Sequence, residues 1–149
     1  MKTYHLHELE SLVGSDLGDS DWLTITQERI NLFAQATGDH QWIHVDPERA
    51  ASGPFGRTIA HGFLTLALVP ELSNSAMQFA DARMSINYGL NRVRFTAPVP
   101  VDSRVRGRLK LLAYEPLEGG VQLTVEVRIE REGSDKPVCI AETLSRRYT

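Results

Sequence analysis

The spacing of apolar residues changes near Arg83, and this change restricts the folds available to the chain. Before Arg83 apolar residues recur at helical spacing, whereas after it apolar and polar residues alternate with the period of two that is typical of β-strands. The alternating segments are about 9–12 residues long and polar on one face, which predicts an antiparallel sheet with one packed and one solvated face. The apolar face is expected to comprise Val105, Gly107, Leu109, Leu111, Val121, Leu123, Val125, Val127 and Ile129, followed by Val138, Ile140, Leu144 and Tyr148 in the last segment.

The first half of the chain carries start and stop signals of short helices. Thr26 is a good N-cap, and Gly38 is a natural stop after a run of apolar residues at helical spacing. Asp46 followed by Pro47 is typical of the N-cap and first residue of a second helix. These signals predict two helices before the long apolar segment that follows.

The segment 58–72 is apolar on nearly all sides, which predicts a helix that is buried on every side. Pro70 is expected to kink or end this helix. A buried helix beside a long one-sided sheet predicts an α+β fold. We therefore expect a single hotdog domain over residues 1–149, with a long curved antiparallel sheet wrapped around a central buried helix. One strand, within 86–99, is expected to carry a bulge at Gly89. Because such a sheet leaves edge strands open, pairing of two copies edge to edge predicts a homodimer.

Charge and composition exclude several kinds of partner. The net charge is -3 and the isoelectric point is about 5.9, so no basic field exists to hold nucleic acid or an anionic membrane. The N-terminus lacks the apolar core of a signal peptide and no apolar run is long enough to span a bilayer, so we expect a cytoplasmic protein. The only cysteine, Cys139, excludes an internal disulfide and a cysteine-based zinc site, and is expected to be a small residue within a strand.

The residues after the first predicted helix are rich in ionisable groups. Asp39, His40, His44 and Asp46 lie within eight positions. A turn here could bring Asp39 and His44 together, and a carboxylate beside an imidazole can hold and polarise one water molecule. The neighbouring Trp42 would make such a pocket partly apolar, which favours shifted pKa values.

A second feature lies near the start of the predicted buried helix, where the sequence reads Ala-His-Gly. Unpaired backbone N–H groups at this point, including that of Gly62, could hold a carbonyl oxygen as negative charge develops on it. A base, a partner acid and an oxyanion site are the minimum for adding water to, or removing it from, a β-carbon conjugated to a carbonyl.

Each of these elements also has a simpler explanation. An aspartate after a helix is commonly a turn former, and His61 is as readily a packing residue at a helix start as a functional one. A metal site of Asp39, His40 and His44 would need both histidines on one face of a helix, and this segment is not convincingly helical. We therefore predict no metal site.

The segment 33–50 resembles the signature of the MaoC-like dehydratase family, the (R)-specific enoyl-CoA hydratases of hotdog fold. That signature is approximately an aromatic residue, a short spacer, a small residue, Gly-Asp-x-Asn-Pro-aliphatic-His and, after five residues, Ala or Ser. Gln41 and Trp42 replace the Asn-Pro pair here, which changes the turn but not the spacing of Asp and His. The matching positions are Phe33, Gly38, Asp39, Ile43, His44 and Ala50, and Gly62 matches the oxyanion glycine downstream.

The resemblance implies a hydro-lyase that adds water reversibly, with syn geometry, to trans-2-enoyl thioesters and needs no cofactor. Asp39 and His44 would hold the catalytic water and share the proton transfers, in an order that the residues leave open. The N–H of Gly62 would stabilise the enolate-like oxygen of the thioester. The acyl chain of an acyl-CoA substrate would lie in an apolar tunnel and contact Trp42 and Leu66. Leu64, Leu68 and Val69 are as readily tunnel walls as core residues. The phosphates of CoA would meet cations at the mouth of the tunnel, and the candidates are Arg57, Arg92 and Arg94.

Two other functions are open to a hotdog domain. Acyl-CoA thioesterases of this fold often place Asp or Glu on the central helix, and 58–70 contains neither. A non-catalytic acyl-CoA-binding module would show saturable binding with no turnover of any enoyl substrate.

Overall fold

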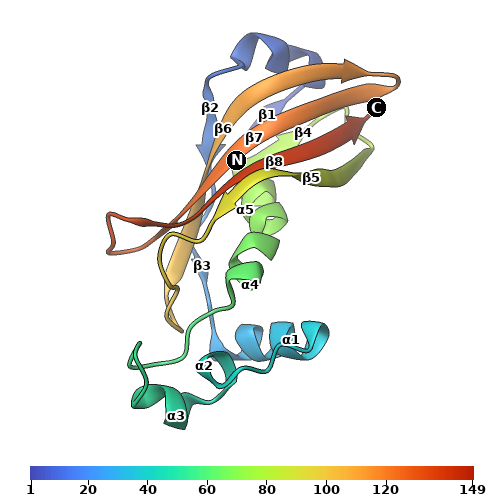
Figure 1. Ribbon diagram of the computed structural model, residues 1–149. Helices are drawn as coiled ribbons and strands as arrows, with labels where there is room; N and C mark the ends of the chain where they lie inside the picture. The colour runs from blue at the N-terminus through green and yellow to red at the C-terminus, as the bar shows by residue number, and fades with distance from the viewer.

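The computed structural model describes residues 1–149 as an antiparallel sheet that curves over two consecutive helices (Figure 1). Three short helices, α1 to α3, gather at one end, and α4 and α5 run from there along the sheet. None of the helices is both long and apolar enough to cross a membrane. In chain order the elements are β1 (Lys2–Tyr4), the 3₁₀ helix η1 (Leu6–Leu12), β2 (Asp16–Asp19), β3 (Leu23–Thr24), α1 (Gln27–Thr37), α2 (Trp42–Val45), α3 (Pro47–Ala51), α4 (Gly62–Ala67), α5 (Val69–Ala76), β4 (Met77–Phe79), β5 (Met84–Arg94), β6 (Arg104–Leu117), β7 (Gly120–Arg131) and β8 (Pro137–Tyr148).

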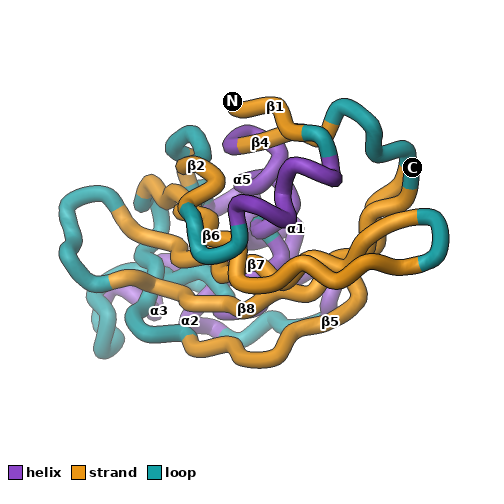
Figure 2. Tube along the Cα trace, turned by 90° about the horizontal axis from the view of Figure 1, so that it is seen from above, coloured by secondary structure: helices purple, strands orange, loops and turns teal.

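The main sheet has the strand order β2-β6-β7-β8-β5, with β3 also paired to β6, and all of these pairs are antiparallel. β1 and β4 form a separate parallel pair. Seen from above, β5 to β8 make a curved layer, and α5 lies between that layer and the β1–β4 pair (Figure 2). The pairing of β5 with β8 shifts register between Asn87 and Gly89, at the bulge that the glycine predicted. The predicted α+β architecture with a long curved antiparallel sheet is confirmed.

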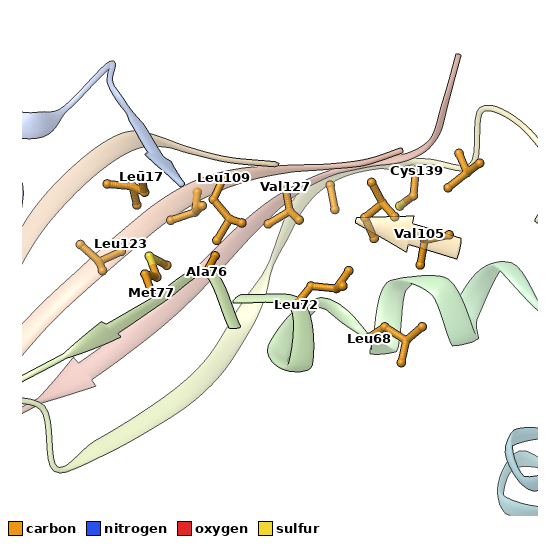
Figure 3. Close-up of a cluster of buried hydrophobic side chains, with 14 of the residues drawn as sticks. Leu17, Leu68, Leu72, Ala76, Met77, Val105, Leu109, Leu123, Val127 and Cys139 are labelled. Carbon is orange, nitrogen blue, oxygen red and sulfur yellow. The ribbon is translucent and has the colours of Figure 1, made fainter. Parts of the chain in front are cut away.

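The core lies between α4–α5 and the inner faces of β6 and β7. Leu72 and Ala76 lie beneath Leu109 and Val127 of the sheet (Figure 3), and all four are buried. Gly107 allows this close approach, because a Cβ at that position would lie 3.3 Å from the Cβ of Leu72. On these two strands the alternation predicted the inner face correctly, since the following residues are all buried: Val105, Gly107, Leu109, Leu111, Val121, Leu123, Val125, Val127 and Ile129.

The helix predicted over 58–72 begins later and extends further than expected. α4 starts at Gly62, and the helical path resumes in α5 and continues to Ala76. Pro70 lies in the first turn of α5, where its missing N–H removes no helical hydrogen bond. Proline therefore accompanies the break at Leu68 and does not end the helical path.

The prediction that this helix is buried on every side is wrong for the single chain. Phe63 of α4 is 69% exposed, because the sheet covers only one side of the helix. The neighbouring strand β5 is the edge of the sheet, and its residues are exposed with the exception of the partly buried Val93. Exposed apolar side chains along this edge are Met84, Ile86, Tyr88 and Leu90, with Phe95 directly after the strand.

The inner face of β8 also differs from the prediction. Residues directly opposite one another in an antiparallel pair share a face of the sheet, and Val125, Val127 and Ile129 pair with Thr143, Ala141 and Cys139. The predicted face is wrong because the register with β7 turns the alternate set inward. The inward residues are Cys139, Ala141, Thr143, Ser145 and Arg147, whereas Ile140, Leu144 and Tyr148 are partly buried on the opposite face and Val138 is buried near the strand start.

Cys139 occupies a fully buried position in β8, as the sequence predicted for a small strand residue. Desolvation of the thiolate by this burial raises the pKa of Cys139 to about 11.

Candidate active site

Local capping interactions bring the chain from α1 into α2 with Asp39 at the turn. Thr26 caps the start of α1 through a 3.1 Å hydrogen bond from the N–H of Arg29. Gly38 ends α1 in the left-handed conformation, at φ 79°, which a glycine adopts without steric cost. The carboxylate of Asp39 then accepts a hydrogen bond from the N–H of Gln41 at 3.3 Å. The sequence did not convincingly predict a helix here, but α2 forms one turn that carries His44.

His44 is buried and held by a backbone carbonyl. Its side chain is 7% exposed, and its Nδ1 lies 2.7 Å from the carbonyl oxygen of Ile59. A carbonyl can only accept, so Nδ1 carries the proton and the neutral ring leaves Nε2 as an acceptor. Burial lowers the pKa of His44, an effect that the Ile59 carbonyl opposes and the nearby His61 reinforces. His44 is therefore suited to be a neutral base.

His61 lies directly against His44, although the sequence left its role open. The two rings stack with centroids 3.9 Å apart, and the Nε2 of His61 lies 3.0 Å from the backbone oxygen of Asp39. The Nδ1 of His61 is buried without a hydrogen-bond partner. One ionisable atom from each of Asp39, His44 and His61 lies within 4.8 Å of the other two. The only sequence signal for His61 is its position beside Gly62.

The three residues include the donor types that bind metals, but the ring geometry does not suit a metal ion. An imidazole binds a metal in the plane of its ring at about 2.0–2.1 Å. The rings of His44 and His61 are stacked at an interplanar angle of 23°, so their planes do not meet at that distance from both rings. This arrangement favours proton handling over metal binding.

His44 and Gly62 line one pocket of about 380 Å³, together with Ile59, Thr65 and Phe95. Gly62 is the first residue of α4, so its N–H has no acceptor within the helix. A Cβ at Gly62 would lie 3.0 to 3.1 Å from three atoms of the Phe95 ring, so any larger residue would require this ring or the start of α4 to shift by a few tenths of an ångström. No pattern in the sequence indicated a role for Phe95. The pocket thus combines an imidazole base with a free backbone donor.

Comparison with known proteins identifies the family. A family model described as "MaoC like domain" matches residues 8–133. The chain belongs to this family. It is 57% identical over 148 residues to 3-hydroxyacyl-thioester dehydratase Z of Mycobacterium tuberculosis, covering 98% of each chain.

Solved structures agree with this assignment. R-hydratase PhaJ1 from Pseudomonas aeruginosa superimposes with a TM-score of 0.74 at 26% identity, over 97% of this chain and 85% of that one. The (R)-hydratase from A. caviae, involved in PHA biosynthesis, gives a TM-score of 0.72 at 26% identity, over 89% and 94%. The expected MaoC-like hotdog fold is confirmed, and the chain is an enzyme of the hydro-lyase class.

In this MaoC-like chain the residues expected to do chemistry lie together, whereas those expected to bind substrate are dispersed. Asp39, His44 and Gly62 meet where α1, α2 and the start of α4 converge (Figure 1). Trp42 instead packs under Arg49, whose guanidinium carbon lies 4.3 Å from the centre of its ring, and does not line the His44 pocket.

The remaining candidates occupy three different surfaces. Arg57 donates to the carbonyl of Val101 at 3.4 Å and lines a separate cleft. Arg92 and Arg94 are exposed on the edge strand β5. Leu66 and Val69 line a groove between the helices and β5, whereas Leu64 and Leu68 belong to the core.

Proposed function

We propose that the protein is an (R)-specific enoyl-CoA hydratase that also runs in reverse as a (3R)-hydroxyacyl-CoA dehydratase. The names of the relatives support this reaction class, and the buried, carbonyl-held His44 beside Asp39 and Gly62 is the observation that carries the proposal. No cofactor or metal is required for this chemistry.

One water molecule would bridge the carboxylate of Asp39 and the free Nε2 of His44. Atoms up to 4.8 Å apart are within reach of a single water that forms hydrogen bonds of about 2.8 Å to each. In hydration the water loses a proton to this pair as its oxygen bonds to the β-carbon, and the α-carbon then receives a proton from the same pair. Delivery from one side gives syn addition. The R configuration at the β-carbon depends in addition on which face of the double bond is turned toward Asp39 and His44, and the (R)-hydratase names of the structural relatives support it.

The N–H of Gly62 would stabilise the charge that forms on the thioester oxygen. As the β-carbon is attacked, electron density moves through the conjugated system to that oxygen, and a fixed backbone donor lowers the barrier without reorganisation. The stack with His61 would hold the His44 ring in place while its proton state changes.

The acyl chain would extend from this pocket along α4 and α5 past Leu66, which lines the adjoining groove. Arg57, Arg92 and Arg94 are proposed to meet the phosphates of the CoA carrier, and Trp42 to support the turn that carries His44. A homodimer would form along β5, because an unpaired edge with an exposed apolar row invites a second copy. A cytoplasmic location stays a prediction.

The alternative thioesterase function gains no support from the longer helical path. α5 includes Glu71, but its carboxylate is bound to Arg29 at 2.9 Å and lies outside the His44 pocket. We expect no thiol release from a saturated acyl-CoA.

The test is ultraviolet loss of the conjugated enoyl thioester, measured with crotonyl-CoA and a longer trans-2-enoyl-CoA. Asp39→Asn should lower turnover by about three orders of magnitude, because the amide cannot accept the proton. Asp135→Asn, in an exposed turn, is the matched control and should retain activity. Saturable binding of acyl-CoA without any turnover by the wild type would instead identify a binding module.

A further inference from the structure

The sheet has a polar inner surface at the end distant from His44. A groove of about 570 Å³ lies between α5 and the strands β5 and β8, and the inward turn of the alternate residues of β8 makes its wall hydrophilic. Polar residues that line it include Ser73, Asn74, Ser85, Asn87, Ser145 and Arg147. A hydrophilic wall on the packed side of a sheet is unusual, because burying unpaired polar groups costs free energy.

Arg147 is the one cation on this inner face of β8, and it has no acidic partner. It takes part in none of the ion pairs of the chain, and its Nε is buried without a hydrogen-bond partner. Its guanidinium carbon lies 4.8 Å from the centre of the Phe79 ring. This contact uses a face of the guanidinium, whereas its N–H groups lie in the plane and remain free to donate.

The surroundings of Arg147 are cationic. No aspartate or glutamate lines the groove or the adjoining pocket of about 390 Å³, and Arg83 lines that pocket as a second cation. Burial lowers the pKa of Arg147, but a guanidinium stays protonated at physiological pH, so the desolvated charge persists. A partly buried cation without an acidic partner is suited to an anionic ligand.

The groove is also placed in line with the candidate active site. Thr65 lines the His44 pocket, and the next residue, Leu66, lines the groove. From Gly62 to Ser73 the helical path advances 11 residues, which is roughly 16 Å at the usual rise of 1.5 Å per residue. The wall changes along this path from apolar, at Leu66 and Val69, to polar beside Arg147.

We propose that this groove receives the far end of the acyl chain and that Arg147 binds a carboxylate carried at that end. The inference rests on the proposed function, since the acyl thioester must be held at His44 for its chain to follow α4 and α5. The preferred substrates would then be thioesters of dicarboxylic acids of medium length, whose middle portion passes the apolar part of the groove.

The test is calorimetric binding of two saturated ligands of equal length, dodecanedioyl-CoA and dodecanoyl-CoA. The wild type should bind the carboxylate-ended ligand about tenfold more tightly, a difference of about 1.4 kcal/mol. Arg147→Met should remove this preference. Arg146→Met is the matched control and should keep it, because Arg146 lies on the other face of β8, 3.6 Å over the ring of Tyr88.

Equal binding of the two ligands by the wild type, or a preference that survives Arg147→Met, would overturn the inference. The first of these results needs no variant, so the inference can be overturned even if Arg147→Met does not fold. Turnover of crotonyl-CoA is measured in parallel, since this short substrate does not reach Arg147. Absence of that turnover in the wild type would contradict the proposed function. Turnover of crotonyl-CoA together with equal binding of the two longer ligands would contradict only the carboxylate site.

Discussion

His44 and Arg147 lie towards opposite ends of the α4–α5 path, and burial acts on both in the same direction. Desolvation lowers the pKa of each side chain, since it disfavours the charged form. An imidazole can respond by losing its proton at neutral pH, whereas a guanidinium cannot. The same physical cause therefore produces a base at one end of the molecule and a persistent, partly buried cation at the other.

The largest expected effect separates the two ends by activity. His44→Asn should lower turnover of crotonyl-CoA by about three orders of magnitude, because the amide is not a base. Arg147→Met in the same assay should leave it nearly unchanged. His7→Asn, at an exposed position, controls for loss of a histidine. If His44→Asn keeps the turnover of the wild type, His44 is not the catalytic base and the two ends of the molecule do not differ in the way described.

A smaller effect is expected at the oxyanion position. Gly62→Ala places a Cβ 3.0 Å from the Phe95 ring, and the shift of α4 away from His44 should lower turnover by about tenfold. Adding Phe95→Leu should restore part of the loss. Gly89→Ala is the control with crotonyl-CoA, which is too short to reach the groove that Gly89 lines, because a Cβ there meets nothing within 4 Å. If Phe95→Leu restores nothing, contact with this ring is not the cause.

At the other end the expected effect is on stability. Arg147→Met should raise the free energy of unfolding by about 1 kcal/mol, because it replaces a desolvated charge that has no partner with an apolar side chain. Urea unfolding monitored by circular dichroism measures the change. Arg146→Met should not stabilise, since Arg146 also donates to Gln122 at 3.0 Å. If Arg147→Met is instead less stable than the wild type, the contact of Arg147 with Phe79 contributes more to stability than the desolvation of its charge costs.

The smallest effect is the pH dependence of stability contributed by His44. Its pKa is lower in the folded protein than the value of 6.5 in the unfolded chain, so the unfolded chain binds more protons as pH falls below about 6.5. The contribution of His44 is fully present above that pH and declines as pH falls through the folded pKa. His44→Asn should flatten this part of the curve of unfolding free energy against pH. An unchanged curve would indicate that His44 is not desolvated.

Sequence reasoning succeeded where the determining interactions are local. Thr26, Gly38 and Asp46 each terminate or start a helix through a conformation or a hydrogen bond within a few residues. The same locality allowed the spacing of Asp39 and His44 to predict that the two side chains meet. The alternation of apolar and polar residues predicted the inner faces of β6 and β7, because in these two strands the polarity of each residue is enough to tell which face it lies on.

Sequence reasoning failed where segments distant in the chain determine the position of a residue. His61 reaches the site from 22 residues beyond Asp39, and contacts of its ring with Phe33 of α1 and His44 of α2 hold it there. On β8 the apolar set Ile140, Leu144 and Tyr148 suggested the inner face, but pairing with β7 turned Thr143, Ser145 and Arg147 inward. The register of a strand is a property of its neighbours as well as of its own sequence.

Cys139 gives the chain a practical property. It is the only cysteine, it is fully buried, and its pKa of about 11 keeps it as an unreactive thiol at neutral pH. Thiol-reactive labels are therefore not expected to modify the natural protein. A spin label attached after Tyr88→Cys on β5 would be the only one in the chain, so any dipolar coupling between labels would report the distance between two copies.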